Sequence, residues 1–160
     1  MNVQEATAIA QESLDNEFSL ESMPVNYVEE IETVIASMAE EQKVKFGHSP
    51  EAGYRWKFKY GTVDVFIQLT GTTDDDYFTV WSSVLPLPAN NEPKLMRLLL
   101  ELNWTSTFEA RYAIVEDRVV ILSSRTVADL SPVEISRSIT IVATLADEND
   151  EPLIEKFGIK

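Results

Sequence analysis

The sequence predicts one α+β domain in which helices pack on one face of a five-stranded antiparallel sheet. Apolar residues recur with the period of a helix in three segments and alternate with the period of a strand in five others. Short turns join successive strands, so neighbouring strands pair antiparallel. A chain of 160 residues that is 44% hydrophobic can build one buried core. The predicted element order is α-β-β-β-α-β-β-α.

The domain is expected to span residues 23–160, preceded by an N-terminal arm at residues 1–22. The arm is polar with scattered apolar positions, and its pattern leaves open whether it is ordered. Ser22 and Pro24 are expected to open the first helix, because proline is favoured in the first turn. This helix extends to about Glu41 and has one apolar face and one acidic face.

Three alternating strands are predicted next. They cover residues 54–60, 63–70 and 77–85. Residues 43–47 before them are expected to be extended or loop. Turns are expected at Gly61-Thr62 and at residues 71–76. Pro86 and Pro88 end the third strand, because neither can donate a ladder hydrogen bond.

A leucine-rich helix is predicted from Glu92 to Trp104, with Asn91 as its N-cap. One face carries leucines at helical spacing, namely Leu95, Leu98, Leu99 and Leu102. Met96 and Leu100 add a second apolar flank, so the helix is expected to be covered on two sides. Its own sheet covers one side. Either another helix of the chain or the same helix of a second subunit covers the other.

A hairpin follows this helix. Its first strand alternates from Thr107, and four side chains share the predicted inner face: Phe108, Ala110, Tyr112 and Ile114. Glu116-Asp117 forms a two-residue turn. The strand from Arg118 has apolar residues on both faces, which is typical of a central position in a sheet.

The last helix is predicted to begin at the sequence Ser131-Pro132-Val133-Glu134, which has an N-cap, a first-turn proline and a capping glutamate. It continues to Ala146. A strand over residues 138–143 is the competing interpretation, because β-branched residues are frequent there. The cap and the length favour the helix. Residues 147–152 are expected to end it, and residues 153–157 to form a short final piece.

The extra apolar flanks of the last two helices predict a homodimer. The expected interface residues are Met96, Leu100, Ile141 and Leu145. Exposing them would leave an apolar patch that soluble monomers rarely show. The competing explanation is that the first helix or the N-terminal arm covers them within one chain.

Charge and composition exclude several classes of function. The net charge is −14, and residues 1–42 hold ten acidic residues without any lysine or arginine. Nucleic-acid binding relies on cations that neutralise phosphates, so no nucleic-acid partner is expected. No apolar run reaches 18 residues, so no membrane segment is expected. The cysteine-free sequence and its polar start predict a cytoplasmic protein.

No pattern indicates catalysis, a cofactor or a metal. His48 is the single histidine, and a solvated loop position explains it best. Asp74-Asp75-Asp76 lacks the glycine and the final glutamate of a calcium loop, so it is expected to be a charged hairpin tip. Five glycines form no phosphate loop. The protein is therefore not expected to be an enzyme.

A basic stripe stands out in the first of the three strands. It consists of Arg55, Lys57 and Lys59. Cross-strand pairing with Asp64, or protection of an edge strand, explains it without a function. Contact with an acidic segment of a partner protein is the functional interpretation.

The stretches VWSSVLPLP, LLLELNW and SPVEISRSITIVATLADENDEPL resemble the YbjN-domain family, which is labelled as a bacterial sensory transduction regulator. The most recognisable features are Leu102-Asn103 and Ala146-Asp147-Glu148, and the resemblance covers roughly residues 24–157. It implies a fold similar to that of type III secretion chaperones, which are acidic homodimers that bind partner proteins. No catalytic residues come with it.

Two functions follow. The resemblance implies a non-catalytic, homodimeric domain that binds a partner protein. The alternative is a small-ligand sensor with an apolar pocket between sheet and helices. The aromatic residues available for such a pocket are Trp56, Phe58, Trp81, Trp104 and Tyr112.

Overall fold

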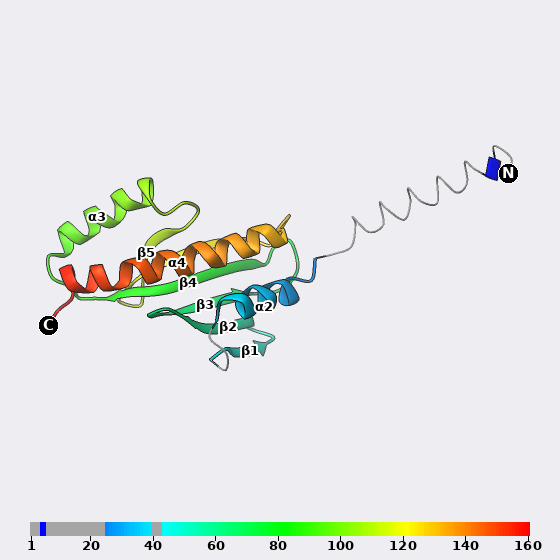
Figure 1. Cartoon of the computed structure of the whole chain (residues 1–160), viewed down its shortest axis with the longest axis horizontal. Helices are drawn as coiled ribbons and strands as arrows, with labels where there is room; N and C mark the ends of the chain where they lie inside the picture. The colour runs from blue at the N-terminus through cyan, green and yellow to red at the C-terminus, as the bar shows by residue number, and fades with distance from the viewer. Residues whose placement is uncertain (1–3, 6–24, 40–42) are drawn as a thin grey trace.

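The computed structural model describes residues 4–5, 25–39 and 43–160, and it shows an α+β domain with one antiparallel sheet (Figure 1). The elements are α2 Tyr27–Met38, β1 Lys45–Ser49, β2 Gly53–Tyr60, β3 Val63–Leu69, β4 Tyr77–Pro86, α3 Glu92–Thr105, β5 Arg111–Val115, β6 Arg118–Thr126 and α4 Pro132–Phe157. The strand order is β1-β2-β3-β4-β6-β5. The predicted fold class is confirmed. The predicted N-terminal arm lies almost entirely outside the described residues.

The sheet has six strands rather than the predicted five, because β1 pairs along the outer edge of β2. The sequence of β1 has one apolar side chain, Phe46, and a central glycine, so it carries no alternating pattern. Contacts between aromatic rings of β1 and β2 hold β1 against the sheet instead. The ring centres of Phe46 and Trp56 lie 5.5 Å apart, and those of His48 and Tyr54 lie 4.3 Å apart. His48 is therefore a strand residue, not a loop residue.

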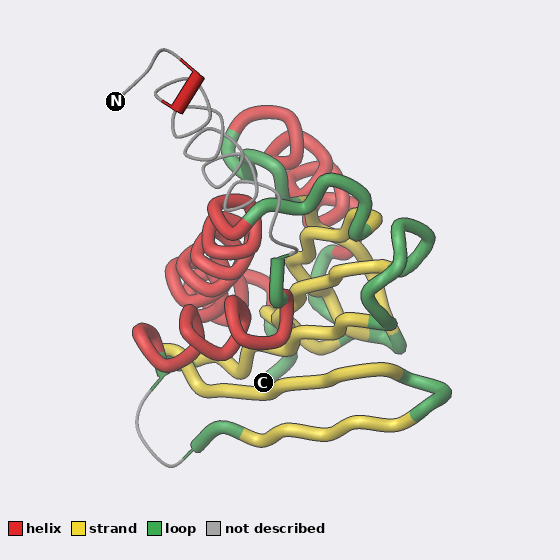
Figure 2. Tube along the Cα trace, turned by 90° about the vertical axis from the view of Figure 1, so that its right-hand side faces the viewer, coloured by secondary structure: helices red, strands yellow, loops and turns green. Residues whose placement is uncertain are grey.

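Helices α2 and α4 cover one face of the sheet, as the sequence predicted (Figure 2). Helix α2 starts after Asn26, whose side chain accepts a hydrogen bond from the N–H of Glu29. The predicted start at Ser22 and Pro24 and the predicted end near Glu41 lie outside the described residues. The inward side chains are fully buried, for example Phe58 of β2 beneath the helices. This face holds the core, and the opposite face of the sheet has no helix among the described elements.

Helix α4 runs unbroken from Pro132 to Phe157, although the sequence predicted an end at residues 147–152. Its start has the predicted capping box between Ser131 and Glu134. Pro152 lies inside the helix, where proline costs roughly 3 kcal/mol. The buried side chains of Leu153 and Phe157 contribute about 1.5–3 kcal/mol each and offset that cost.

The hairpin of β5 and β6 has the predicted turn, with φ of 46° at Glu116 and 58° at Asp117, which suits a two-residue hairpin loop. Strand β6 lies between β4 and β5, which explains its two apolar faces. Strand β5 begins at Arg111, later than predicted. Before it, the N–H of Ala110 donates to the carbonyl of Thr107 and closes a turn. The predicted strand position of Phe108 is therefore wrong.

Candidate functional site

Helix α3 and strand β5 form a unit at one end of the molecule (Figure 1). Leu95 and Leu99 are the buried side chains of α3. Asn90, just before the helix, donates its backbone N–H to the carbonyl of Phe157 at 2.7 Å, which ties this end of α3 to the end of α4. The following Asn91 occupies the N-cap position, but its side chain makes no capping hydrogen bond, contrary to the prediction. Helix α3 is therefore anchored along one side only.

The outward side of this unit is apolar and exposed. We call it the α3–β5 surface, and it consists of Leu100, Trp104, Phe108 and Ile114. Val115, the next exposed residue of β5, points to the other face of the sheet, where it lies near Phe66 and Trp81. The side chain of Trp104 is 90% exposed, that of Phe108 74% and that of Leu100 70%. The described part of the chain has eleven large hydrophobic residues with exposed side chains, and the four of this surface all fall within residues 100–114. Exposed apolar side chains concentrated in this way mark an interaction site.

The four predicted interface residues differ in exposure. Leu100 is exposed and belongs to the α3–β5 surface. Met96, Ile141 and Leu145 are half-buried and pack against the core. The first helix does not cover Leu100, because α2 packs beside α4 and β2. Phe108 and Ile114 were expected on a buried strand face. Phe108 instead precedes β5, and Ile114 lies on a strand at the edge of the sheet, and no local pattern in the sequence indicated either position.

The basic stripe lies on the helix-free face of the sheet. The Nζ atom of Lys57 lies 3.6 Å from a carboxylate oxygen of Asp64 on β3, so the predicted cross-strand pair is present. The same Nζ atom lies 5.4 Å from the ring centre of Phe66. Strand β1 pairs with residues 53–57 of β2, so protection of an edge does not explain Arg55 or Lys57. Lys59 lies beyond the end of β1, on an outer edge without a neighbouring strand, where edge protection still applies. Arg55 is exposed and Lys59 half-buried.

The five aromatic residues considered for an apolar pocket do not gather around one cavity. Trp56 and Phe58 are buried in the core under the helices. Trp81 stacks on Phe66, with 5.5 Å between ring centres, and Phe66 pairs with Lys57 of the stripe. Trp104 is exposed on α3. These aromatic residues therefore do not line one apolar pocket, as the small-ligand sensor would require.

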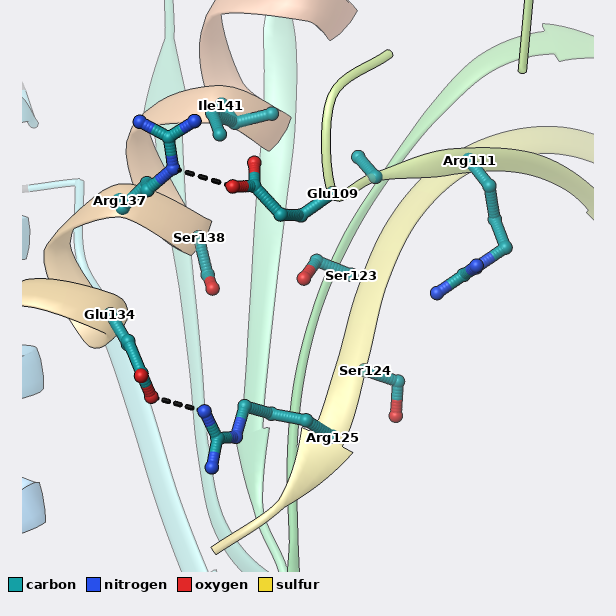
Figure 3. A pocket seen from close by; sticks show the side chains of 10 residues that line it. Glu109, Arg111, Ser123, Ser124, Arg125, Glu134, Arg137, Ser138 and Ile141 are labelled. Atoms are coloured by element: carbon teal, nitrogen blue, oxygen red, sulfur yellow. Dashed lines mark hydrogen bonds and ion pairs between the residues drawn. The ribbon is translucent and has the colours of Figure 1, made fainter. Parts of the chain in front are cut away.

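A polar cavity of about 370 Å³ lies between α4 and the end of β6 (Figure 3). Two ion pairs cross it. The Nε atom of Arg137 donates to Glu109 at 2.8 Å, and Arg125 donates to Glu134. The hydrogen bond from Arg137 lowers the pKa of Glu109, and the same bond raises the pKa of Arg137. We call it the β6-edge cavity, because Ser123 and its neighbours at the end of β6 line it.

The three consecutive aspartates lie in a turn that hydrogen bonds to Asp76 hold closed. Asp76 accepts hydrogen bonds from the N–H of Thr73 at 2.9 Å, from its hydroxyl at 2.8 Å and from the hydroxyl of Thr70 at 3.0 Å. The bonds from Thr73, above all the backbone one, lower the pKa of Asp76. Within residues 4–5, 25–39 and 43–160, no three histidine or carboxylate side chains gather as metal ligands. In the same ranges no helix is long and apolar enough to span a membrane.

Comparison with solved structures shows the same architecture elsewhere. The type III secretion chaperone SycH of Yersinia pestis, in complex with a stable fragment of YscM2, superposes with a TM-score of 0.51 at 14% identity, covering 78% of this chain and 99% of the other. A chain of the ExsC–ExsE complex superposes with a TM-score of 0.45 at 14% identity, covering 71% of this chain and 77% of the other. The SycH match shows that the fold is that of a type III secretion chaperone.

Sequence comparison gives the family. No curated protein sequence matches the chain significantly. A family model described as "Putative bacterial sensory transduction regulator" matches residues 28–155, from the first turn of α2 to the last turn of α4. Because this match spans most of the chain, and the element order agrees with the predicted resemblance, the chain belongs to the YbjN family.

Proposed function

We propose that this chain is a non-catalytic, homodimeric protein of the cytoplasm that binds a partner protein in a regulatory role. The observation that carries the proposal is the exposed α3–β5 surface, with Trp104 at 90% exposure. Membership of the YbjN family supports a regulatory role. The fold shared with SycH supports partner binding, since SycH holds a fragment of YscM2 in its complex.

A second copy of the chain fits the α3–β5 surface better than a charged partner does. Two chains of charge −14 repel each other, and an apolar, locally neutral patch adds no further repulsion when two copies meet there. The charges nearest Leu100 and Trp104 are Arg97 and Glu101, which pair with each other at 3.0 Å and cancel. In a twofold arrangement Arg97 of each copy can also face Glu101 of the other, which makes the surface complementary to itself.

The energy available from this surface is sufficient for a dimer. Burying a large apolar side chain contributes about 1.5–3 kcal/mol. Leu100, Trp104 and Phe108 are each counted twice in a twofold interface, and the total exceeds the lower estimates of the entropic cost of association. The half-buried Met96, Ile141 and Leu145 remain part of the proposed interface, at its periphery.

Sedimentation velocity on the native chain tests the dimer. We expect twice the mass of one chain at micromolar concentration, and a monomer for the double variant L100E/W104E. The matched control is Y77E at the start of β4, because Tyr77 is 52% exposed but lies outside the α3–β5 surface and its periphery, and this variant should remain a dimer. A wild-type monomer refutes the dimer, and a dimeric L100E/W104E variant places the interface elsewhere.

The partner protein is proposed to contact the basic stripe on the helix-free face. Arg55 and Lys59 make no ion pair with any described residue, so both charges are available to an acidic segment. The test is affinity capture from the host with wild type, with R55E/K59E, and with the control K94E/K160E, which changes two exposed lysines elsewhere. A partner retained by wild type and the control but lost with R55E/K59E supports the contact, and equal retention by all three contradicts it.

A further inference from the structure

Strands β3 and β4 separate at one end of the sheet. The last residues that pair there are Val65 of β3 and Ser82 of β4. Residues 63–64 before this pair and residues 83–86 after it do not pair with each other, because β4 is irregular at this point and continues along β6 alone. A cleft of about 560 Å³ lies between the two segments, and residues of α4 also line it. We call it the β3–β4 cleft.

The carboxylate of Asp150 lines this cleft from α4, and one of its oxygen atoms has no partner. The residue is 6% exposed, and no described residue hydrogen-bonds to its Oδ1 atom. Its Oδ2 atom lies 2.8 Å from the hydroxyl of Thr62, and that hydroxyl also lies 3.1 Å from Oδ1 of Asp147. A hydroxyl carries one hydrogen, so it can donate to only one of the two carboxylates at a time.

No cation compensates the buried carboxylate of Asp150. None of the described lysine, arginine or histidine side chains forms an ion pair with it. A buried carboxylate with less than one full donor costs free energy. A cationic donor that enters the cleft and reaches Oδ1 would recover part of that cost.

The rest of the cleft lining is negatively charged as well. Two further carboxylates line it, those of Asp64 and Glu116, against the single guanidinium of Arg118. The Nε atom of Arg118 donates to the hydroxyl of Ser83 at 2.5 Å. Asp64 pairs with Lys57 at 3.6 Å, whereas Glu116 is exposed and makes no ion pair with any described residue. The cleft therefore attracts cations.

The residues next to Asp150 are apolar. Ile154 lies one turn further along α4, on the same side of the helix, and it lines the cleft with 47% of its surface exposed. Val63 follows Thr62 in the chain, and it lines the cleft together with Val84 of β4. These side chains suit a ligand that carries its charge on an aliphatic chain, since small-molecule sites combine apolar walls with a few placed polar groups.

We propose that the β3–β4 cleft binds a small aliphatic amine, whose primary ammonium group donates a hydrogen bond to Oδ1 of Asp150. A primary ammonium concentrates its charge and three donors on one compact group, which suits an acceptor as deeply buried as this one. The volume lies within the range of small-molecule sites. This ligand site goes beyond the proposed partner binding and does not depend on it.

Titration of the full ¹⁵N-labelled chain with 1,4-diaminobutane tests the proposal, with sodium chloride at matched ionic strength as the reference. The amide signals of residues 62–64, 83–84 and 150 should shift in a saturable manner that sodium chloride does not reproduce. The control ligand is the fully N-methylated form of the same diamine, which keeps both charges but has no N–H to donate, and it should not saturate these signals. Equal binding of the two ligands, or no saturable shift up to roughly 10 mM diamine, overturns the proposal.

D150N decides whether the buried carboxylate binds the amine. This variant should weaken diamine binding by about tenfold or more, since it removes a hydrogen bond between two charged groups. The matched control is D75N, because Asp75 is exposed and lies outside the cleft, while the change in net charge is the same. D75N should bind as wild type does, and urea denaturation verifies that D150N is folded. Unchanged binding by folded D150N, or equal losses in the two variants, contradicts the proposal.

I154K gives a second test that leaves Asp150 in place. A lysine at this position lies four residues after Asp150 on the same helix, so it supplies a tethered ammonium that competes with the ligand. Ile154 is 47% exposed, so the fold should tolerate the change. I154K should bind the diamine about tenfold more weakly or worse, whereas the control I154M keeps an apolar side chain and should bind as wild type does. Diamine binding by I154K at wild-type strength overturns the proposal, whether or not D150N folds.

Discussion

The side chain of Asn103 completes the hydrogen bonding of the backbone of Tyr112. The Oδ1 atom of Asn103 accepts from the N–H of Tyr112 at 2.6 Å, and its Nδ2 atom donates to the carbonyl oxygen of Tyr112 at 3.3 Å. Both backbone groups point to the outer side of β5, which is the edge strand of the sheet. One amide side chain thus replaces a neighbouring strand and joins α3 to the sheet.

This relationship predicts a large effect of N103A on stability. The variant leaves two backbone groups of a half-buried edge without partners, so the free energy of unfolding should fall by about 1–3 kcal/mol. Urea denaturation measures the change. The matched control is N149A, because Asn149 is also helical but donates only to the carbonyl of Leu145 in its own helix. Equal losses in the two variants would show that the link between α3 and β5 is energetically unimportant.

The features that sequence reasoning predicted correctly have local causes. The start of α4 depends on Ser131 and Glu134, which lie three residues apart and cap the helix together. Strand β3 alternates cleanly because one face of the sheet is fully buried. The features that it missed depend on distant contacts. Strand β1 is held by aromatic rings of β2, and α4 passes Pro152 because its last turns are buried.

The candidate site was only partly predictable for the same reason. Leu100 was identified from its place on a second apolar flank of α3, and it is exposed as a dimer interface requires. Periodicity shows which side chains share a face, but it does not show which face the rest of the chain covers. The exposure of Trp104 follows from the single-sided anchoring of α3, and that anchoring depends on Asn90 meeting the end of α4.

Removal of the proline inside α4 should stabilise the protein. Pro152 is exposed and cannot donate the helical hydrogen bond, so P152A should raise the free energy of unfolding by roughly 1–3 kcal/mol. Guanidinium denaturation measures the gain. The control is P132A at the first turn of the same helix, where the missing N–H has no helical acceptor to lose, so no comparable gain is expected. A destabilised P152A would mean that the proline has a packing role.

Thr62 should be the critical residue of the contact between the β2–β3 turn and α4. Its hydroxyl lies 2.8 Å from Oδ2 of Asp150, and its N–H donates to Oδ1 of Asp147 at 2.9 Å. Asp150 is 6% exposed, and its other carboxylate oxygen has no partner among the described residues. T62V removes the one hydroxyl that serves Asp150 and should lower the free energy of unfolding by about 1–3 kcal/mol. T62S keeps the hydroxyl and should stay near wild type in the same urea titration.

Acid should weaken the turn that Asp76 closes. Hydrogen bonds from Thr73 place the pKa of Asp76 below its usual value of 3.8, so the folded state favours the carboxylate. A lowered folded pKa contributes stability above the unfolded value, and this contribution is lost as the pH falls through the folded value. Urea denaturation from about pH 6 downward should therefore show a loss below about pH 4 that D76N reduces. An unchanged acid slope in D76N would assign that loss to other carboxylates.

Alkaline pH should destabilise the protein through Tyr112. Its side chain is 8% exposed, and burial raises the pKa of its phenol to about 12, against about 10 in an unfolded chain. Because the folded pKa is the higher one, the contribution is fully present below about pH 10 and is lost as the pH rises to about 12. Two pKa units correspond to roughly 2–3 kcal/mol.

Denaturation of wild type and Y112F between about pH 9 and pH 12 measures this contribution. Wild type should lose stability across that range, whereas Y112F keeps the buried ring, has no phenol to ionise, and should lose less. The matched control is Y77F, because the side chain of Tyr77 is 52% exposed, and this variant should retain the wild-type slope. Absorbance titration of the phenolates gives an independent readout, in which one of the five tyrosines of the native chain ionises late and is missing from Y112F. Parallel alkaline slopes for wild type and Y112F would show that Tyr112 reaches solvent, and the hydrogen-bonded junction of α3 and β5 would then be open in solution.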